Sequence, residues 1–109
     1  MPNEDTQIEQ MIQESGAAAP RLTPDHIDAK IVSDYYHVVP DTTLTICVLT
    51  LENGFTVTGE SAAASPENFR AAIGRQIAFE NARAKIWQLE GYMLRERLHE
   101  IAMKEQANG

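Results

Sequence analysis

Residues 65–106 read SPENFRAAIGRQIAFENARAKIWQLEGYMLRERLHEIAMKEQ, and they are the most informative part of the chain for its fold. Beyond Pro66 it holds no further proline, and its apolar residues recur three or four positions apart. Ser65 is a favourable helix cap, and Pro66 and Glu67 suit the first helical turn. The pattern predicts one long helix beginning at Ser65, which would measure about 60 Å if straight. Because such a rod is too long for a lone small domain, we expect it to fold back, to kink near Gly91 or to pack on a partner chain.

Three segments before this helix are rich in β-branched and aromatic residues, which is typical of strands. They cover residues 31–39, 43–51 and 55–60. Asn53-Gly54 predicts a tight type I′ hairpin, because both residues tolerate positive φ. The middle segment has apolar residues on both alternating faces, so we expect a central strand with both faces at least partly covered. Thr23-Pro24-Asp25 predicts a short helix ahead of the sheet.

The predicted fold class is therefore α+β: a three-stranded antiparallel meander, preceded by a short helix and followed by a long or kinked C-terminal helix. A chain of 109 residues is expected to form one domain. We predict a flexible N-terminal arm over residues 1–22, and a single α+β domain over residues 23–109.

Charge is distributed unevenly along this acidic chain, whose formal net charge is -7. Residues 1–60 hold ten acidic and two basic side chains, a balance of -8, while residues 61–109 hold six acidic and seven basic ones, a balance of +1. Duplex nucleic acid would be repelled by the overall charge and is not an expected partner. No apolar stretch approaches the roughly 20 residues that span a bilayer, so no membrane partner is expected. The acidic N-terminus lacks the layout of a secretory signal, and we predict a cytoplasmic protein.

Motifs for catalysis or metal binding do not appear in the sequence. The three histidines are scattered, and there is no CxxC, HExxH, GxSxG or phosphate-binding glycine motif. Cys47, the single cysteine, lies within a predicted strand and is expected to be a buried apolar residue rather than a nucleophile. We therefore predict a protein that is not an enzyme, with no metal and no cofactor.

Basic and aromatic side chains are interleaved along the predicted long helix. Arginine can grip a phosphate with two hydrogen bonds, and an aromatic face can stack on a base, so this mixture is what a small nucleotide pocket needs. A solvated helix face with packing aromatics would give the same composition. The candidate ligand-binding residues are Phe69, Arg75, Asn81, Lys85, Tyr92 and Arg95.

Three small or polar residues inside the predicted helix call for an explanation. Asn81 is a poor helix former, so it is expected either to make a register-setting polar contact or to offer its amide to a ligand. Gly74 and Gly91 also weaken a helix, and close helix–helix approach would explain both of them.

Several of these segments together resemble a known family. LTICVLTLENGFTVTGE at residues 44–60, SPENF at 65–69, GRQIAFENA at 74–82 and KIWQLEGYML at 85–94 resemble a family of short tailed-phage proteins. That family is named after numbered phage gene products, forty-nine of one phage and sixty-six of another. The resemblance covers roughly residues 22–98.

The arrangement of a small sheet followed by long helices is also similar to the first type of phage Thoeris anti-defence proteins. Those proteins sequester the cyclic ADP-ribose-type signal made by host TIR proteins, and some hold cyclic oligonucleotides. They form dimers or larger rings, with ligand pockets at subunit contacts. This similarity implies a non-catalytic anti-defence protein that binds a small nucleotide signal in the host cytoplasm as a homo-oligomer, a dimer or higher.

No ligand contact of that group is carried over to this chain, so the roles of the candidate residues rest on their chemistry. Arg75 and Arg95 would hold phosphates and Lys85 would add positive charge. Asn81 would hydrogen-bond to a base or ribose, and an aromatic such as Phe69 or Tyr92 would stack. The alternative is a non-enzymatic interaction or assembly protein that binds a host or phage protein through its C-terminal helix.

Overall fold

The computed structural model describes residues 7, 8, 10 and 21–108. Its elements follow one another as α2 (Pro24–Ala29), β1 (Ile31–Val38), β2 (Leu44–Leu51), β3 (Thr56–Ala62), the 3-10 helix η1 (Pro66–Asn68) and α3 (Ala71–Asn108). The α+β fold with a long C-terminal helix is confirmed. The predicted arm over residues 1–22 falls mostly outside the described residues. In the described part of the chain, no helix has the length and apolar character needed to cross a membrane.

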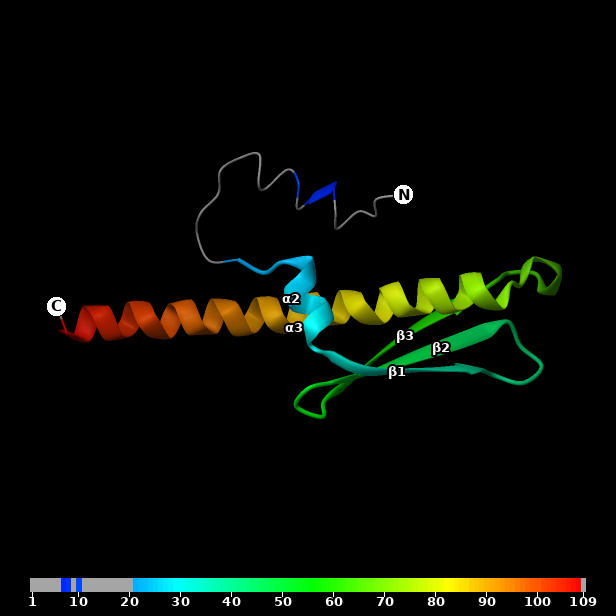
Figure 1. Ribbon diagram of the computed structural model, residues 1–109, viewed down its shortest axis with the longest axis horizontal. Coiled ribbons are helices and arrows are strands. Elements are labelled where there is room, and N and C mark those ends of the chain that lie inside the picture. Colours follow the sequence, from blue (N-terminus) through cyan, green and yellow to red (C-terminus); the bar gives the residue numbers. More distant parts are fainter. Residues whose placement is uncertain (1–6, 9, 11–20, 109) are drawn as a thin grey trace.

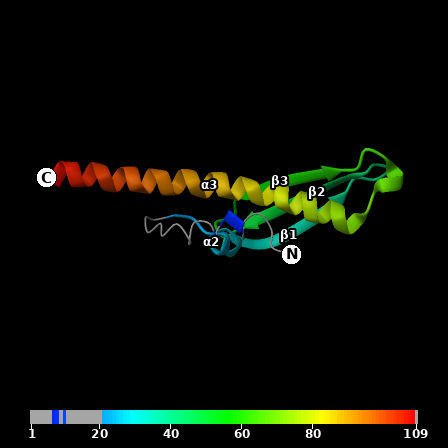
Figure 2. The ribbon, with the colours of Figure 1, turned by 90° about the horizontal axis from the view of Figure 1, so that it is seen from above.

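The three strands form an antiparallel sheet in the order β1-β2-β3. Helix α3 lies along one face of this sheet and extends well past its end, as Figures 1 and 2 show from two directions. Odd-numbered residues of β2 point toward α3 and are buried, including Cys47 and Leu49. The even-numbered residues of β2 are half-buried on the other face. Both faces of this strand are therefore at least partly buried, as expected, although among the described elements α3 covers only one of them.

The β2–β3 hairpin differs from the predicted type I′ turn. Its loop has three residues, because the N–H of Leu51 donates to the carbonyl of Phe55 at 2.8 Å and the N–H of Gly54 donates to that of Leu51 at 2.8 Å. Gly54 has φ of 90°, whereas Asn53 is not among the described residues with positive φ. A single left-handed residue at the end of a three-residue loop is the G1-bulge arrangement. The Asn-Gly pair fits this loop because its glycine takes the left-handed position.

The long helix begins later than predicted. Residues Pro66–Asn68 form a separate 3-10 turn, and Phe69 is extended, with φ of -70° and ψ of 130°. The guanidinium of Arg70 donates to the carbonyl oxygens of Glu67 and Phe69, at 3.0 and 2.8 Å, and so occupies acceptors that a continuous helix would use itself. The Ser65 hydroxyl donates to the Glu67 carboxylate instead of capping α3.

Helix α3 is continuous over 38 residues, so the predicted kink near Gly91 is absent. Apart from Arg83, which contacts α2, its buried residues lie four apart and face the sheet; they are Gly74, Ala78, Ala82, Ile86 and Glu90. This ladder of mostly small residues lets the helix approach β3 so closely that a side chain at Gly59 would meet the backbone of Ala78 and Ala82. Gly74 likewise faces Thr45 of β2, and a Cβ at Gly91 would meet nothing within 4 Å. The expected helix–helix approach at the two helix glycines is therefore wrong within this chain: Gly74 makes a helix–sheet contact and Gly91 is open.

Candidate functional site

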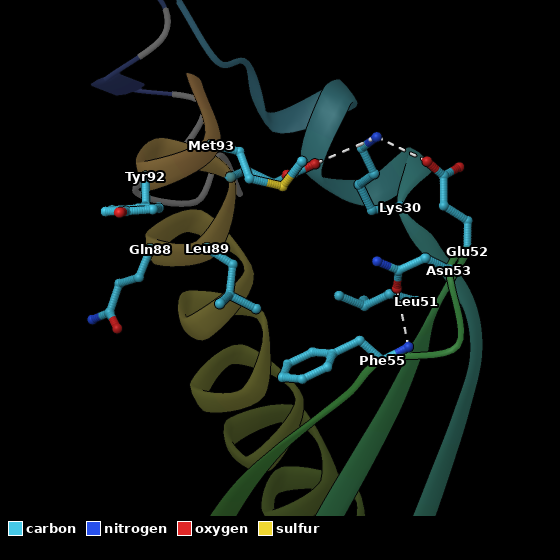
Figure 3. Close-up of a pocket in the computed structure, with 10 residues that line it drawn as sticks. Lys30, Leu51, Glu52, Asn53, Phe55, Gln88, Leu89, Tyr92 and Met93 are labelled. Carbon is cyan, nitrogen blue, oxygen red and sulfur yellow. Dashed lines mark hydrogen bonds and ion pairs between the residues drawn. The ribbon is translucent and has the colours of Figure 1, made fainter. Parts of the chain in front are cut away.

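A hollow of about 400 Å³ lies between α3 and the β2–β3 hairpin, as Figure 3 shows. Its volume is in the range of pockets that hold small ligands. Its lining residues are Lys30, Leu51, Glu52, Asn53, Phe55, Gln88, Leu89, Glu90, Tyr92 and Met93. Apolar side chains from the helix and the hairpin form most of this surface, and charged groups gather at the end nearest α2.

Helix periodicity and the hairpin loop position the apolar part of this hollow. Leu89 and Met93 are four residues apart on α3 and so lie on the same side of the helix. Phe55 follows the loop directly, where the Asn53 side-chain oxygen accepts a hydrogen bond from its backbone N–H at 3.0 Å. In Figure 3, Leu89 and Phe55 point toward each other across the hollow, whereas Gln88 and Tyr92 stand on the outer rim and point away. Phe55 is 55 % exposed, so part of this residue is accessible to a ligand.

The charged end of the hollow is internally paired. The Lys30 ammonium lies 2.8 Å from the Glu52 carboxylate and 3.4 Å from the Glu90 carboxylate, and His26 Nε2 lies 3.3 Å from the same oxygen of Glu90. The hydrogen bond between Lys30 and Glu52 raises the pKa of Lys30 and lowers the pKa of Glu52. Because two carboxylates face this one ammonium, Lys30 has no excess positive charge to offer a phosphate. This end suits neutral or hydrogen-bond-donating groups.

A second hollow, of about 340 Å³, adjoins the first one along α3. The two share three lining residues, Phe55, Gln88 and Leu89, and the second adds Lys85 and the adjacent part of β3. Within the described chain, Lys85 is exposed and has no ion pair. We call the two hollows together the hairpin groove. It has a free cation at one end, the Phe55 ring in the middle and the paired Lys30 at the other end.

The six candidate residues predicted from the sequence do not meet in one chain. Lys85 and Tyr92 border the hairpin groove. Arg75 and Arg95 are exposed, and their separation of 20 residues along α3 corresponds to about 30 Å. Phe69 is half-buried where η1 joins α3, with its ring against Gly74. A single ligand of nucleotide size can therefore reach only a subset of the six within one copy.

Asn81 has a structural contact that explains its place in the helix. Its amide nitrogen donates to the backbone carbonyl of Glu60 on β3 at 2.8 Å. This strand is at the edge of the sheet, so the bond ties an otherwise free carbonyl to α3. The amide oxygen remains on an exposed side chain, one helical turn before Lys85.

Sequence reasoning missed Phe55 and the charged group at Lys30. Phe55 carried a usable signal, because a large apolar residue that follows a turn directly often stays exposed. The contact of Lys30 with Glu52 and Glu90 joins three distant parts of the chain, so no local sequence pattern predicts it.

Three further residues with polar or titratable side chains lie buried or half-buried in the core, away from the hairpin groove. Arg83 is buried and its Nε donates to the Asp28 carboxylate at 2.7 Å, which ties α2 to α3. The thiol of Cys47 is buried, and burial raises its pKa. Burial also raises the pKa of Tyr36, whose register partner is Cys47. Among the described residues, no group of three His, Cys, Asp or Glu side chains could hold a metal ion.

Comparison with known proteins gives one match. The model of the family described as "Phage protein (N4 Gp49/phage Sf6 gene 66) family" matches residues 22–98. This range begins just before α2 and ends within α3, so it contains the sheet and the hairpin groove. No curated protein and no solved structure matches the chain.

Proposed function

The chain belongs to the phage protein (N4 Gp49/phage Sf6 gene 66) family, and we propose that it is a non-catalytic binding protein that sequesters a small host nucleotide signal. The signal would be a cyclic ADP-ribose-type molecule or a cyclic oligonucleotide in the host cytoplasm. The observation that carries the proposal is the hairpin groove, where the half-exposed Phe55 ring lies between the unpaired Lys85 and the paired Lys30.

Each part of the groove suits one part of a nucleotide. A base can stack on the ring of Phe55, and such stacking contributes roughly 1–3 kcal/mol per base. The Lys85 ammonium is free to meet a phosphate, whereas Lys30 is held by two carboxylates. Those carboxylates can accept hydrogen bonds from an exocyclic amine or a ribose hydroxyl. Binding of this kind needs slow release and no chemical step.

The predicted residues that do not point into the groove require a second copy of the chain to reach a shared ligand. Arg75 and Arg95 are about 30 Å apart on one helix, and Tyr92 points away from the hollow. Two α3 helices side by side would bring such groups from one copy toward the groove of the other. We therefore propose a homo-oligomer, a dimer or higher, as the binding species.

Calorimetry with a panel of cyclic ADP-ribose isomers and cyclic dinucleotides tests this proposal. We expect stoichiometric binding of at least one member at micromolar protein. Phe55→Ala and Lys85→Ala should each weaken it at least about tenfold, the equivalent of about 1.4 kcal/mol. Lys104→Ala removes the same charge from an exposed position at the far end of α3 and should leave affinity unchanged. Absence of binding to every member would refute the proposal, and chemical conversion of the recovered ligand would show an enzyme instead.

A second candidate is an interaction protein that binds a host or phage protein through α3. The observation in its favour is the end of the helix beyond Glu90, which projects past the sheet with apolar residues at heptad-like spacing. These are Leu94, Leu98 and Ile101. Affinity capture from infected cells separates the two candidates, because a sequestering protein binds its nucleotide alone in vitro. For the interaction protein, Leu98→Glu should abolish capture of a specific partner while Lys85→Ala leaves it intact.

A further inference from the structure

The face of the sheet opposite α3 is partly apolar although no described element covers it. Its centre is formed by Ile46 and Val48 of β2, which are half-buried between their neighbours. Tyr35 of β1, the register partner of Val48, is 63 % exposed. In Figure 1, α3 and α2 lie on one side of the sheet and no described segment lies on the other. A face that meets only water normally carries mostly polar side chains, so this one is suited to a contact.

Two polar side chains of opposite character flank the apolar centre in register. Ile46 of β2 is paired with His37 on one side and with Glu60 on the other. Alternation along each strand places all three on the same face, away from α3. Both His37 and Glu60 are exposed, and they stand on the two opposite edge strands of the sheet. The open face therefore has a hydrogen-bond donor on one edge, an acceptor on the other and aliphatic residues between them.

We propose that this open face packs against the same face of a second copy of the chain. The two copies are related by a two-fold axis that lies between the sheets and runs parallel to β2. This arrangement places β1 of each copy opposite β3 of the other. It brings His37 of each copy opposite Glu60 of the other, and places Ile46 against Ile46 and Val48 against Val48. The contact is isologous, with two identical polar pairs around one apolar centre. Sheets that pack face to face in this way lie about 10 Å apart.

The size of the face sets the strength of this contact. Three strands about 4.8 Å apart and about 26 Å long offer roughly 370 Å² per copy. A stable interface needs about 800 Å² per partner, so the sheet contact alone is weak. It lies on the opposite side of the sheet from α3 and from the hairpin groove. It can therefore join copies that already pair through α3, and it does not depend on nucleotide binding.

A charge-reversal series in the full chain tests the proposal by sedimentation velocity over a wide range of protein concentration. His37→Glu places two carboxylates opposite one another, and Glu60→Lys removes the acceptor that faces His37, so each should halve the mass seen at high concentration. The double variant places opposite charges across the contact and should restore the mass. Asn68→Glu, which adds a negative charge to η1 away from the face, should have no effect. Thermal melting shows that each variant is folded, and Tyr35→Glu provides an independent disruption of the same face.

Each remaining outcome overturns the proposal. A folded His37→Glu variant with the mass of the unaltered chain at every concentration shows that the face makes no contact between copies. Loss of mass in both single variants without recovery in the double variant shows that a different surface covers the face, such as α3 of a second copy. A single monomer mass for the unaltered chain throughout the range overturns it as well.

Discussion

Replacing Gly59 by alanine tests whether α3 sits on β3 as closely as the structure has it. A Cβ at this position would lie 2.8 Å from the Cα of Ala82, and closer still to the Ala82 nitrogen and the Ala78 carbonyl oxygen. These are backbone atoms of a helix, so no side-chain rotation relieves the overlap. An ordinary carbon–carbon separation is about 3.5 Å, so α3 must move outward by at least about 0.7 Å. Overpacking of this kind costs up to roughly 3 kcal/mol.

For a domain of this size, 1 kcal/mol corresponds to about 4–8 °C in Tm. Gly59→Ala should therefore lower Tm by as much as about 12–24 °C, measured by circular dichroism at one fixed protein concentration. Gly91→Ala is the matched control, because the added methyl meets nothing within 4 Å and alanine favours the helix by roughly 1 kcal/mol. The Tm of Gly74→Ala should lie between those of Gly59→Ala and Gly91→Ala, because the added methyl would meet the side chain of Thr45 at 2.9 Å rather than backbone. A Tm of Gly59→Ala within 2–3 °C (about 0.5 kcal/mol) of the Tm of the unaltered chain would show that α3 does not lie as close to β3 as described here.

Three further outcomes follow from buried or paired groups. Cys47 is fully buried with a raised pKa, so thiol reagents at pH 8 should label it at least about tenfold more slowly in the folded chain than in denaturant. Thr45→Val should raise the free energy of unfolding by roughly 1 kcal/mol in chemical denaturation, because the buried Thr45 hydroxyl has no hydrogen-bond partner among the described residues. The Lys30–Glu52 pair should stabilise the fold between two limits. On the acid side, this stabilisation is fully present above pH 4.5, the ordinary pKa of Glu, and is lost as the pH falls through the lowered pKa of Glu52. On the alkaline side, it is fully present below pH 10.5, the ordinary pKa of Lys, and is lost as the pH rises through the raised pKa of Lys30. Glu52→Gln should remove the acid-side dependence from a profile of Tm against pH and should only weaken the alkaline one, because Glu90 remains 3.4 Å from Lys30.

The strands could be predicted from the sequence because local and tertiary preferences agree there. Each predicted strand is within two residues of the observed one at both ends. The start of the long helix could not be predicted from the sequence, because Ser65 and Pro66 are equally compatible with a 3-10 turn. What decides between them is Phe69, whose extended backbone lets its ring lie against Gly74 of α3. That contact joins the junction to the folded helix and leaves no periodic signal.

The candidate site was only partly accessible from sequence for a geometric reason. Composition identified α3 as the carrier of basic and aromatic residues, and Lys85 and Tyr92 do border the groove. The rise of an α-helix already implies that Arg75 and Arg95 lie about 30 Å apart, so their separation could have been foreseen. The hairpin side of the groove depends on the loop having three residues rather than two. A two-residue loop would shift Phe55 by one position and turn its side chain to the opposite face of the sheet.

The two ends of α3 have different roles: the first part stabilises the fold, and we expect the second part to take part in assembly. Residues up to Glu90 pack on the sheet, and the remainder adds about 27 Å of helix that the sheet does not cover. Most of the stability of helices in proteins comes from tertiary packing of an apolar face, so contacts that its own sheet does not provide would stabilise this segment. Leu94, Leu98 and Ile101 supply apolar side chains for them. Substitutions at these three positions should therefore change the mass of the assembly and leave the melting of the sheet-packed unit nearly intact, whereas Gly59→Ala acts on the unit itself.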